Sequence, residues 1–206
     1  MTVGTAKMRR KDIMSRRTVL SAPAVLALAA STAAKAEPGR EPQFGGGKFL
    51  TAYFTRSGNT RVIAGIVHRT FGTDLYEIQP AQPYPEDYEA TVERARQERD
   101  RGDEPPLAGL VSNLAGYDTI FLGFPIWGET APPVIRSFLH THDLRGKTVR
   151  PFITHGGYGL GNSLSVLASH APGARIEPPF VMEADQERRT LNQVRGWLNH
   201  INGDTP

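Results

Sequence analysis

The stretch Thr55-Arg-Ser-Gly-Asn-Thr60 decides the fold. It follows an apolar run at residues 49–54 and precedes a helical pattern that begins near Arg61. A strand, a hydroxyl-rich turn and a helix N-terminus in this order build an anion site, because unpaired N–H groups and the helix dipole both favour negative charge there. The Ser and Thr hydroxyls add donors, and Gly58 lets the backbone approach the anion closely. The stretch therefore predicts a phosphate-binding turn.

Other phosphate loops are excluded by their spacing. A Walker loop needs G-x-x-x-x-G-K-[ST]. Gly47-Lys48 is followed by Phe49, and Gly146-Lys147 has Thr141 where the first glycine would stand. The glycine cluster at 156–161 does not have the G-x-G-x-x-G spacing of a dinucleotide loop. The turn at 55–60 therefore suits a terminal phosphate monoester better than a pyrophosphate or triphosphate.

Short apolar runs alternate with amphipathic stretches from Lys48 onward. This alternation predicts a parallel sheet covered by helices on both faces. The expected strands are 48–54, 74–79, 118–124, 148–154 and 176–182, and the expected helices are 60–71, 86–101, 131–141, 161–170 and 186–201. The charge-rich helix at 86–101 is interpreted as a solvated face with i,i+4 ion pairs, with a docking surface for a redox partner as the alternative.

Three segments together resemble the flavodoxin family, and in particular its members with a "PIW" and a "THGG" loop. They are Thr55–Thr60, Pro125-Ile-Trp-Gly-Glu-Thr130 and Thr154-His-Gly-Gly-Tyr-Gly-Leu-Gly161, each directly after a predicted strand. The resemblance covers roughly residues 48–202. It implies an α/β flavodoxin-like three-layer sandwich with a five-stranded parallel sheet in the order 2-1-3-4-5. It also implies FMN as the cofactor, bound at the carboxyl ends of the strands.

The resemblance assigns cofactor contacts to each of these loops. The phosphate loop contributes Thr55, Arg56, Ser57, Gly58, Asn59 and Thr60; the second loop contributes Pro125, Ile126, Trp127 and Gly128; the third contributes Thr154, His155, Gly156, Gly157, Tyr158 and Gly161. Trp127 would stack on the flavin ring, and Tyr158 would give an outer stacking face. The alternatives are an ordinary helix N-cap at Asn59 or Thr60, a core role for Trp127 and a purely structural turn at His155.

The first 36 residues have the features of a signal peptide of the twin-arginine class. Arg16-Arg17 precedes a weakly apolar stretch at 19–30, and Ala34-Lys35-Ala36 forms a small-x-small cleavage site. The apolar stretch is shorter than the ~20 residues of a transmembrane helix, so no membrane anchor is expected after cleavage. Residues 37–47 read as a flexible linker before a flavodoxin-like domain at 48–202. The expected location is periplasmic or secreted.

Charge and residue types narrow the function further. The net charge of +3 comes from the leader, because residues 37–206 carry 17 Lys and Arg against 20 Asp and Glu. No nucleic-acid partner is therefore expected. The absence of Cys excludes disulfides and lipoprotein anchoring. His140-Thr-His142-Asp143 has no second ligand cluster, so no metal is expected, and no G-x-S-x-G motif points to a hydrolase.

Three functions remain open at this point. The leading hypothesis is an exported FMN protein that transfers electrons to or from a redox partner protein or a small-molecule donor or acceptor. The enzymatic alternative is an FMN-dependent NAD(P)H or quinone reductase. The third is a partner-binding module with the flavodoxin fold and no flavin.

Overall fold

The computed structural model of the chain describes residues 48–184 and 187–203. The predicted leader, cleavage site and linker lie outside the described residues. In order along the chain the elements are β1 (Phe49–Tyr53), α1 (Asn59–Phe71), β2 (Asp74–Glu77), α2 (Tyr88–Arg101), the 3-10 turn η1 (Leu114–Gly116), β3 (Thr119–Pro125), α3 (Pro133–Thr141), β4 (Thr148–His155), α4 (Ser163–His170), β5 (Arg175–Ile176), β6 (Phe180–Glu183) and α5 (Glu187–Gly203).

The sheet is parallel, with strands in the order β2-β1-β3-β4-β5, and β6 also pairs with β4. This order confirms the predicted fold class. The fifth strand, expected at 176–182, is divided into β5 and β6. The division falls at Pro178-Pro179, where two consecutive prolines have no N–H to donate to the ladder.

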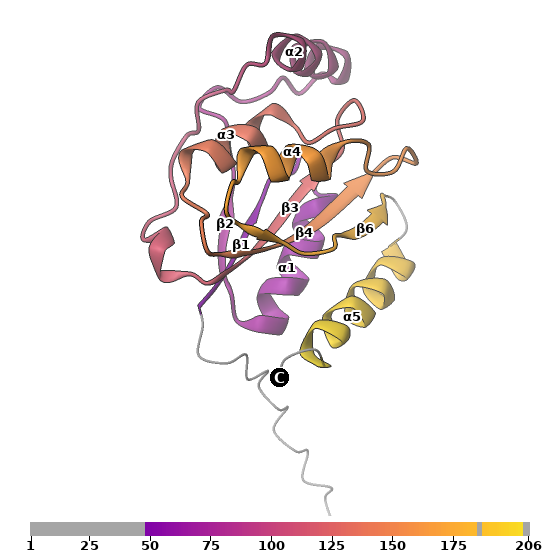
Figure 1. The fold of residues 1–206 in the computed structure, drawn as a ribbon. Coiled ribbons are helices and arrows are strands. Elements are labelled where there is room, and N and C mark those ends of the chain that lie inside the picture. The colour runs from indigo at the N-terminus through magenta and orange to yellow at the C-terminus, as the bar shows by residue number, and fades with distance from the viewer. Residues whose placement is uncertain (1–47, 185–186, 204–206) are drawn as a thin grey trace, which may run out of the picture. The chain divides into compact units, whose positions relative to one another are not determined.

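Alternate side chains of the central strands point into two separate cores. Ile120, Leu122 and Phe124 of β3 pack under α3 and α4, whereas Phe121 packs with α1 and α5 on the other face. This follows from the two-residue period of a strand. Figure 1 shows the resulting layers, with α3 and α4 on one side of the sheet and α1 and α5 on the other. None of the described helices is both long enough and apolar enough to span a membrane.

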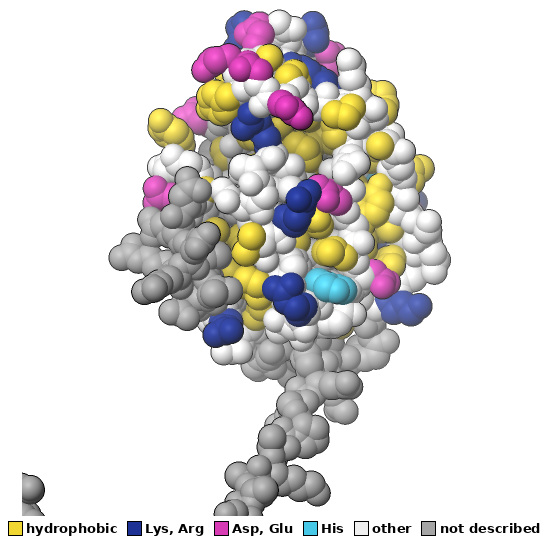
Figure 2. All heavy atoms as spheres, turned by 180° about the vertical axis from the view of Figure 1, so that it is seen from behind, with side chains coloured by type: hydrophobic (Ala, Val, Ile, Leu, Met, Phe, Trp, Pro, Cys, Tyr) yellow, Lys and Arg dark blue, Asp and Glu magenta, His cyan; other side chains and the backbone are white. Residues whose placement is uncertain are grey.

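Helix α2 is the exception to this layering. Figure 1 shows it at the top of the molecule, beyond α3 and away from both faces of the sheet. Only Thr91, Ala95 and Glu98 are buried in it. Figure 2, a view from behind, shows acidic and basic side chains gathered at this end of the molecule. Many charged side chains of α2 are solvated, as the sequence indicated, but the stripe next to the sheet edge has another role, described below.

Candidate functional site

The three predicted loops meet at one edge of the sheet. They follow β1, β3 and β4, which are neighbours, so the carboxyl ends of these strands lie side by side. A cavity of about 730 Å³ opens there. Of the predicted contacts, it is lined by Thr55, Arg56, Ser57, Asn59, Thr60, Pro125, Ile126, Trp127, Gly128, Thr154, His155, Gly156 and Tyr158. Gly58, Gly157 and Gly161 do not line the cavity.

The phosphate loop leaves the first turn of α1 without a side-chain cap. Gly58 occupies the N-cap position with φ +94°, in the left-handed region that favours glycine, and no side chain bonds to the first turn. The alternative N-caps at Asn59 and Thr60 are therefore wrong. Thr55 Oγ1 accepts the Gly58 N–H at 3.1 Å, which closes the turn in front of the helix. The N–H groups of the first turn thus remain free of a capping side chain and suit an anion.

Two buried hydroxyls join the first loop to the third. Thr60 Oγ1 lies 3.0 Å from Thr154 Oγ1, and the two residues are 1% and 2% exposed. Each hydroxyl carries one hydrogen, and only one of the two hydrogens is used in this bond. The second hydrogen remains for a further acceptor at the wall of the cavity.

Arg56 brings an unneutralised positive charge to the phosphate loop. Its Nη2 donates to the Glu86 carbonyl oxygen at 2.9 Å, and its guanidinium lies 5.3 Å from the centre of the Tyr88 ring. Among the described residues no carboxylate pairs with it. A guanidinium held by a carbonyl and an aromatic face keeps its full charge, which favours an anionic ligand next to α1.

Trp127 and its neighbours form a tight turn in the lining of the cavity. Trp127 N donates to Thr130 O at 3.0 Å, and both intervening residues are left-handed, Gly128 with φ +57° and Glu129 with φ +62°. This is the geometry of a two-residue hairpin turn. The Trp127 ring is also edge-on to Phe54 at 5.1 Å and to Tyr84 at 4.8 Å. Trp127 therefore lines the cavity and packs against the core at the same time.

His155 organises the third loop. Its Nδ1 accepts the N–H groups of Gly157 at 3.0 Å and Gly159 at 3.4 Å. An imidazole that accepts at Nδ1 carries its proton on Nε2 when neutral. His155 is thus the turn residue that the sequence offered as one alternative, and it also lines the cavity.

Gly161 serves loop packing. A Cβ at Gly161 would collide with the Glu129 backbone, and Asn162 N donates to Glu129 O at 3.0 Å. The second and third loops are therefore in direct backbone contact, which requires glycine at this position.

Helix α2 forms a wall of the cavity that the sequence analysis did not foresee. The lining includes Tyr88, Thr91, Val92, Ala95, Arg96 and Arg99. Their spacing of three and four residues marks one helical face. Tyr88 is 62% and Val92 is 42% exposed, so large apolar surface remains open beside the cavity. The many charged residues of α2, two of which lie on this stripe as Arg96 and Arg99, obscured it in the sequence.

The two ends of α2 approach different loops. Tyr88, at its start, contacts Arg56 of the phosphate loop. The Arg99 guanidinium, near its end, occupies the place where a Cβ on Gly128 would lie. The helix therefore runs across the cavity from the phosphate loop to the turn at 127–130.

A polar network attaches α2 to the loop before it. Glu98, only 6% exposed, accepts from Tyr84 Oη at 2.7 Å and from Arg94 Nε at 2.8 Å. Arg94 also donates to the carbonyl oxygens of Gln82 and Pro83 and lies over the Tyr84 ring. Burial, together with the hydrogen bond to Glu98, raises the pKa of Tyr84, so this hydroxyl stays protonated and continues to donate.

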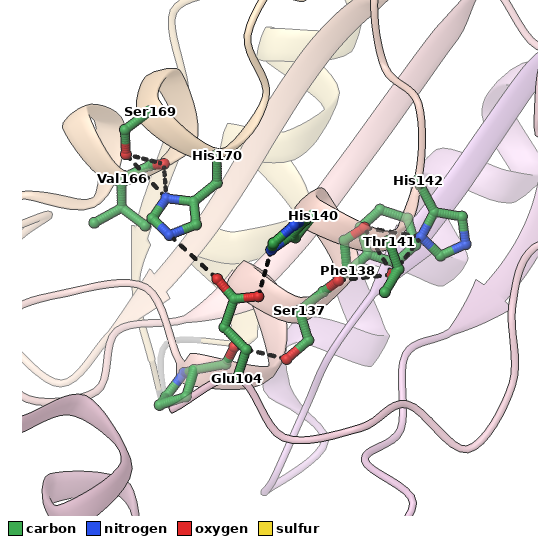
Figure 3. A network of polar contacts seen from close by, with 10 residues as sticks. Glu104, Ser137, Phe138, His140, Thr141, His142, Val166, Ser169 and His170 are labelled. Carbon is green, nitrogen blue, oxygen red and sulfur yellow. Dashed lines mark hydrogen bonds and ion pairs between the residues drawn. The ribbon is translucent and has the colours of Figure 1, made fainter. Parts of the chain in front are cut away.

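The two histidines of the His140-Thr-His142 stretch contact different groups. Figure 3 shows His140 pointing toward Glu104 and His142 pointing away from it. His140 Nδ1 lies 2.8 Å and His170 Nε2 lies 3.6 Å from the Glu104 carboxylate, whereas His142 Nε2 accepts the Val111 N–H at 3.0 Å. No group of three His, Cys, Asp or Glu suited to a metal ion occurs within residues 48–184 and 187–203.

One buried polar group on the cavity wall lacks a partner. Thr130 is 3% exposed, and its Oγ1 makes no hydrogen bond. The uncapped α1 and Arg56 offer an anion site near one end of α2, and Trp127 offers an aromatic surface near the other. These residues fit a ligand that has a phosphate at one end and a flat ring at the other.

The fold and the three strand-end loops define an α/β protein with a cavity at the carboxyl edge of its sheet, and comparisons place it in a family. A family model described as Flavodoxin matches residues 48–201. The chain belongs to the flavodoxin family. Among curated proteins, no match to the chain was found.

Solved structures from three organisms are similar to the chain. A candidate flavoprotein from Bacteroides eggerthii is 35% identical with a TM-score of 0.64, over 75% of this chain and 98% of that one. A candidate flavoprotein from Bacteroides uniformis is 34% identical with a TM-score of 0.66, over 75% and 99%. A flavoprotein from Lactobacillus acidophilus in complex with FMN is 22% identical with a TM-score of 0.59, over 71% and 99%, and shows the shared fold.

Proposed function

We propose that this protein binds FMN at the carboxyl edge of its sheet and transfers electrons outside the cytoplasm. The observation that carries the proposal is the cavity of about 730 Å³, which is lined by all three strand-end loops. The similar structure from Lactobacillus acidophilus, which is a complex with FMN, supports the same cofactor. The leader with Arg16-Arg17 supports export, since the twin-arginine pathway carries folded proteins that already hold their cofactor.

Each part of the cavity would meet a different part of the cofactor. The uncapped N-terminus of α1, with the Arg56 charge beside it, would hold the phosphate. Trp127 and the glycine-rich third loop would hold the ring. FMN supplies the redox chemistry, and the protein orients it and sets the polarity around it.

A reductase of small molecules is the second candidate, and α2 favours it. A carrier that serves a protein partner needs an accessible edge of the ring, whereas α2 crosses this cavity with Tyr88, Val92 and Arg99 on its inner face. An apolar stripe next to guanidinium groups suits a planar small molecule, such as a quinone or a nicotinamide. Steady-state turnover of NAD(P)H or a quinone by the purified protein would favour the reductase, and reduction without turnover would favour the carrier.

The purified mature protein tests the assignment of FMN as the cofactor. The protein should be yellow, and after denaturation it should release FMN, which chromatography identifies. Release of FAD would contradict the monophosphate site, because the turn at 55–60 lacks a pyrophosphate fingerprint. A colourless protein that does not bind added FMN would favour the partner-binding module.

A further inference from the structure

The lining of the cavity carries more positive than negative charge. Of the described residues that form it, Arg56, Arg96 and Arg99 are basic and Glu129 is acidic. Arg56 lies beside the uncapped start of α1, where the phosphate of FMN would take up its charge. The two arginines of α2 lie farther along the helix, so they are left for a second anionic group.

Arg99 presents an unused edge of its guanidinium to the turn at 127–130. Its Nε and Nη2 donate to Asp100 Oδ1 at 3.0 and 2.9 Å, and Asp100 does not line the cavity. Its Nη1 makes no hydrogen bond to the described residues and lies so close to Gly128 that a Cβ there would collide with it. Asp100 thus holds one edge of the guanidinium, and the N–H groups of Nη1 are available to a ligand.

The other charges near this turn are more strongly screened. Arg96 pairs with Glu93 at 2.8 Å, and its side chain is 55% exposed, against 33% for Arg99. An exposed, paired guanidinium contributes little to binding. Glu129 is exposed and makes no ion pair with the described residues, so it would repel an anion beside it. Arg99 is therefore the main donor to an anion at this end of α2.

The stripe of α2 that leads to Arg99 is apolar. Val92 and Ala95 line the cavity between the two ends of the helix, and Val92 is 42% exposed. Trp127 lines the same cavity. Apolar side chains and an indole ring suit the faces of a flat ring, and a guanidinium at the end of the stripe suits an acidic group on that ring.

We infer that this cavity binds a flat aromatic or quinone-like molecule that carries an acidic group. The ring lies along Val92 and Ala95, and the acidic group accepts hydrogen bonds from Arg99 Nη1. The inference rests on the proposed function, since it names the class of small molecule that the flavin protein would meet beside its cofactor. It also makes Arg99 a residue that determines specificity by charge.

The test compares two probes that share one ring system, naphthalenesulfonate and uncharged naphthol. The protein is first saturated with FMN, so that the phosphate site is filled and cannot take the sulfonate. Titration calorimetry then measures the Kd of each probe. Arg99→Gln should raise the Kd for naphthalenesulfonate roughly tenfold, the equivalent of a partly exposed charged hydrogen bond, and should change that for naphthol by less than about twofold.

Two further variants fix the sign and the place of the effect. Glu129→Gln should lower the Kd for naphthalenesulfonate by about two- to threefold, because it removes the repelling charge. Arg101→Gln is the matched control, since Arg101 pairs with Asp103 and does not line the cavity. It should leave both Kd values unchanged.

The wild-type protein provides a test that needs no variant. Raising the salt concentration from about 0.05 to about 0.5 M should raise the Kd for naphthalenesulfonate several-fold and not that for naphthol. FMN-loaded protein in which neither salt nor Arg99→Gln distinguishes the two probes would overturn the inference and leave the proposed function standing. Protein that binds no FMN would overturn the proposed function itself.

Discussion

Trp127 contributes at the residue scale to both the core and the cavity. It is edge-on to Phe54 and Tyr84 and also lines the cavity. Trp127→Ala should therefore weaken FMN affinity by about 1–3 kcal/mol and should also lower the free energy of unfolding of the apoprotein. Both are measured on one preparation, by FMN titration and by urea unfolding.

Trp197 is the control for that prediction. It packs on Phe180 at 5.1 Å and Phe121 at 6.1 Å, on the sheet face opposite α3 and α4. Because Trp197 is only partly buried, Trp197→Ala should cost about 3 kcal/mol of stability, the low end for such a change, without changing the Kd for FMN. If Trp197→Ala weakened FMN binding and Trp127→Ala did not, the two tryptophans would have the reverse roles.

The turn at Gly128-Glu129 permits a second prediction about single residues. Both residues are left-handed, a conformation that costs a non-glycine residue about 1–2 kcal/mol. Glu129→Gly should therefore leave the apoprotein as stable or stabilise it by up to about 1 kcal/mol. Gly128→Ala should destabilise it, since its Cβ would also meet the Arg99 guanidinium. Urea unfolding of the two apoproteins measures both effects, and destabilisation by Glu129→Gly would contradict the argument.

Sequence reasoning found the loops because each follows a strand and carries a distinctive set of residues. It could not assign Gly161 to backbone packing, because its contact partner Glu129 lies in another loop. It also could not single out Thr130, because the lack of a hydrogen-bond partner is a property of the folded environment. Residue type and spacing identify candidate contacts, and only the fold shows which of them remain unpaired.

His142 links α3 to the segment that follows α2, and it makes this contact sensitive to pH. Its Nδ1 donates to Phe138 O at 2.8 Å within α3, and its Nε2 accepts the Val111 N–H from the segment that follows α2. Burial lowers the pKa of His142 below the ordinary value of 6.5. Protonation would remove the acceptor at Nε2, so the folded state favours the neutral imidazole.

The direction of the pH effect follows from this lowered pKa. Above about pH 6.5 the imidazole is neutral in both the folded and the unfolded state. As the pH falls below that value, the unfolded chain takes up the proton first, and the folded state loses relative stability. Wild-type apoprotein should therefore lose stability relative to His142→Gln between about pH 7 and 5. Urea unfolding across this range measures the difference, and parallel curves for the two proteins would contradict the argument.

At the scale of helices and strands, the fold could be predicted wherever the hydrophobic pattern of the sequence reflects burial in the core. The alternation of apolar runs and amphipathic stretches predicted the parallel sheet and its covering helices, because both sheet faces must be buried. The strand order came from the resemblance to the flavodoxin family. The fifth strand is divided at Pro178-Pro179. The sequence analysis missed this division because the residues around the two prolines are apolar and read as one continuous strand. The place of α2 was not predictable, because its attachment depends on the buried Glu98, whose neighbours on the helix are solvated ion pairs.

At the scale of the whole molecule, one prediction concerns the predicted leader, which lies outside the described residues. Arg16→Lys together with Arg17→Lys should block export, because the twin-arginine pathway depends on that pair. The precursor should remain in the cytoplasm, folded and loaded with FMN. Cell fractionation with detection of the flavin tests this, and the single substitution Lys35→Arg is the control. Normal export of the double variant would contradict the assignment of the leader.

The position of α2 has a consequence for how this protein can diversify. The helix buries only Thr91, Ala95 and Glu98, so the two hydrophobic cores place few demands on its sequence. Its inner stripe is nevertheless a wall of the cavity. The other positions of α2 can therefore change, provided that its buried residues and Arg94 are kept. Its caps must also be kept: the Asp87 side chain accepts the Ala90 N–H, and Gly102 ends the helix in a left-handed conformation. Selectivity for the reaction partner can change on this helix while the sheet and the cofactor loops keep their sequence.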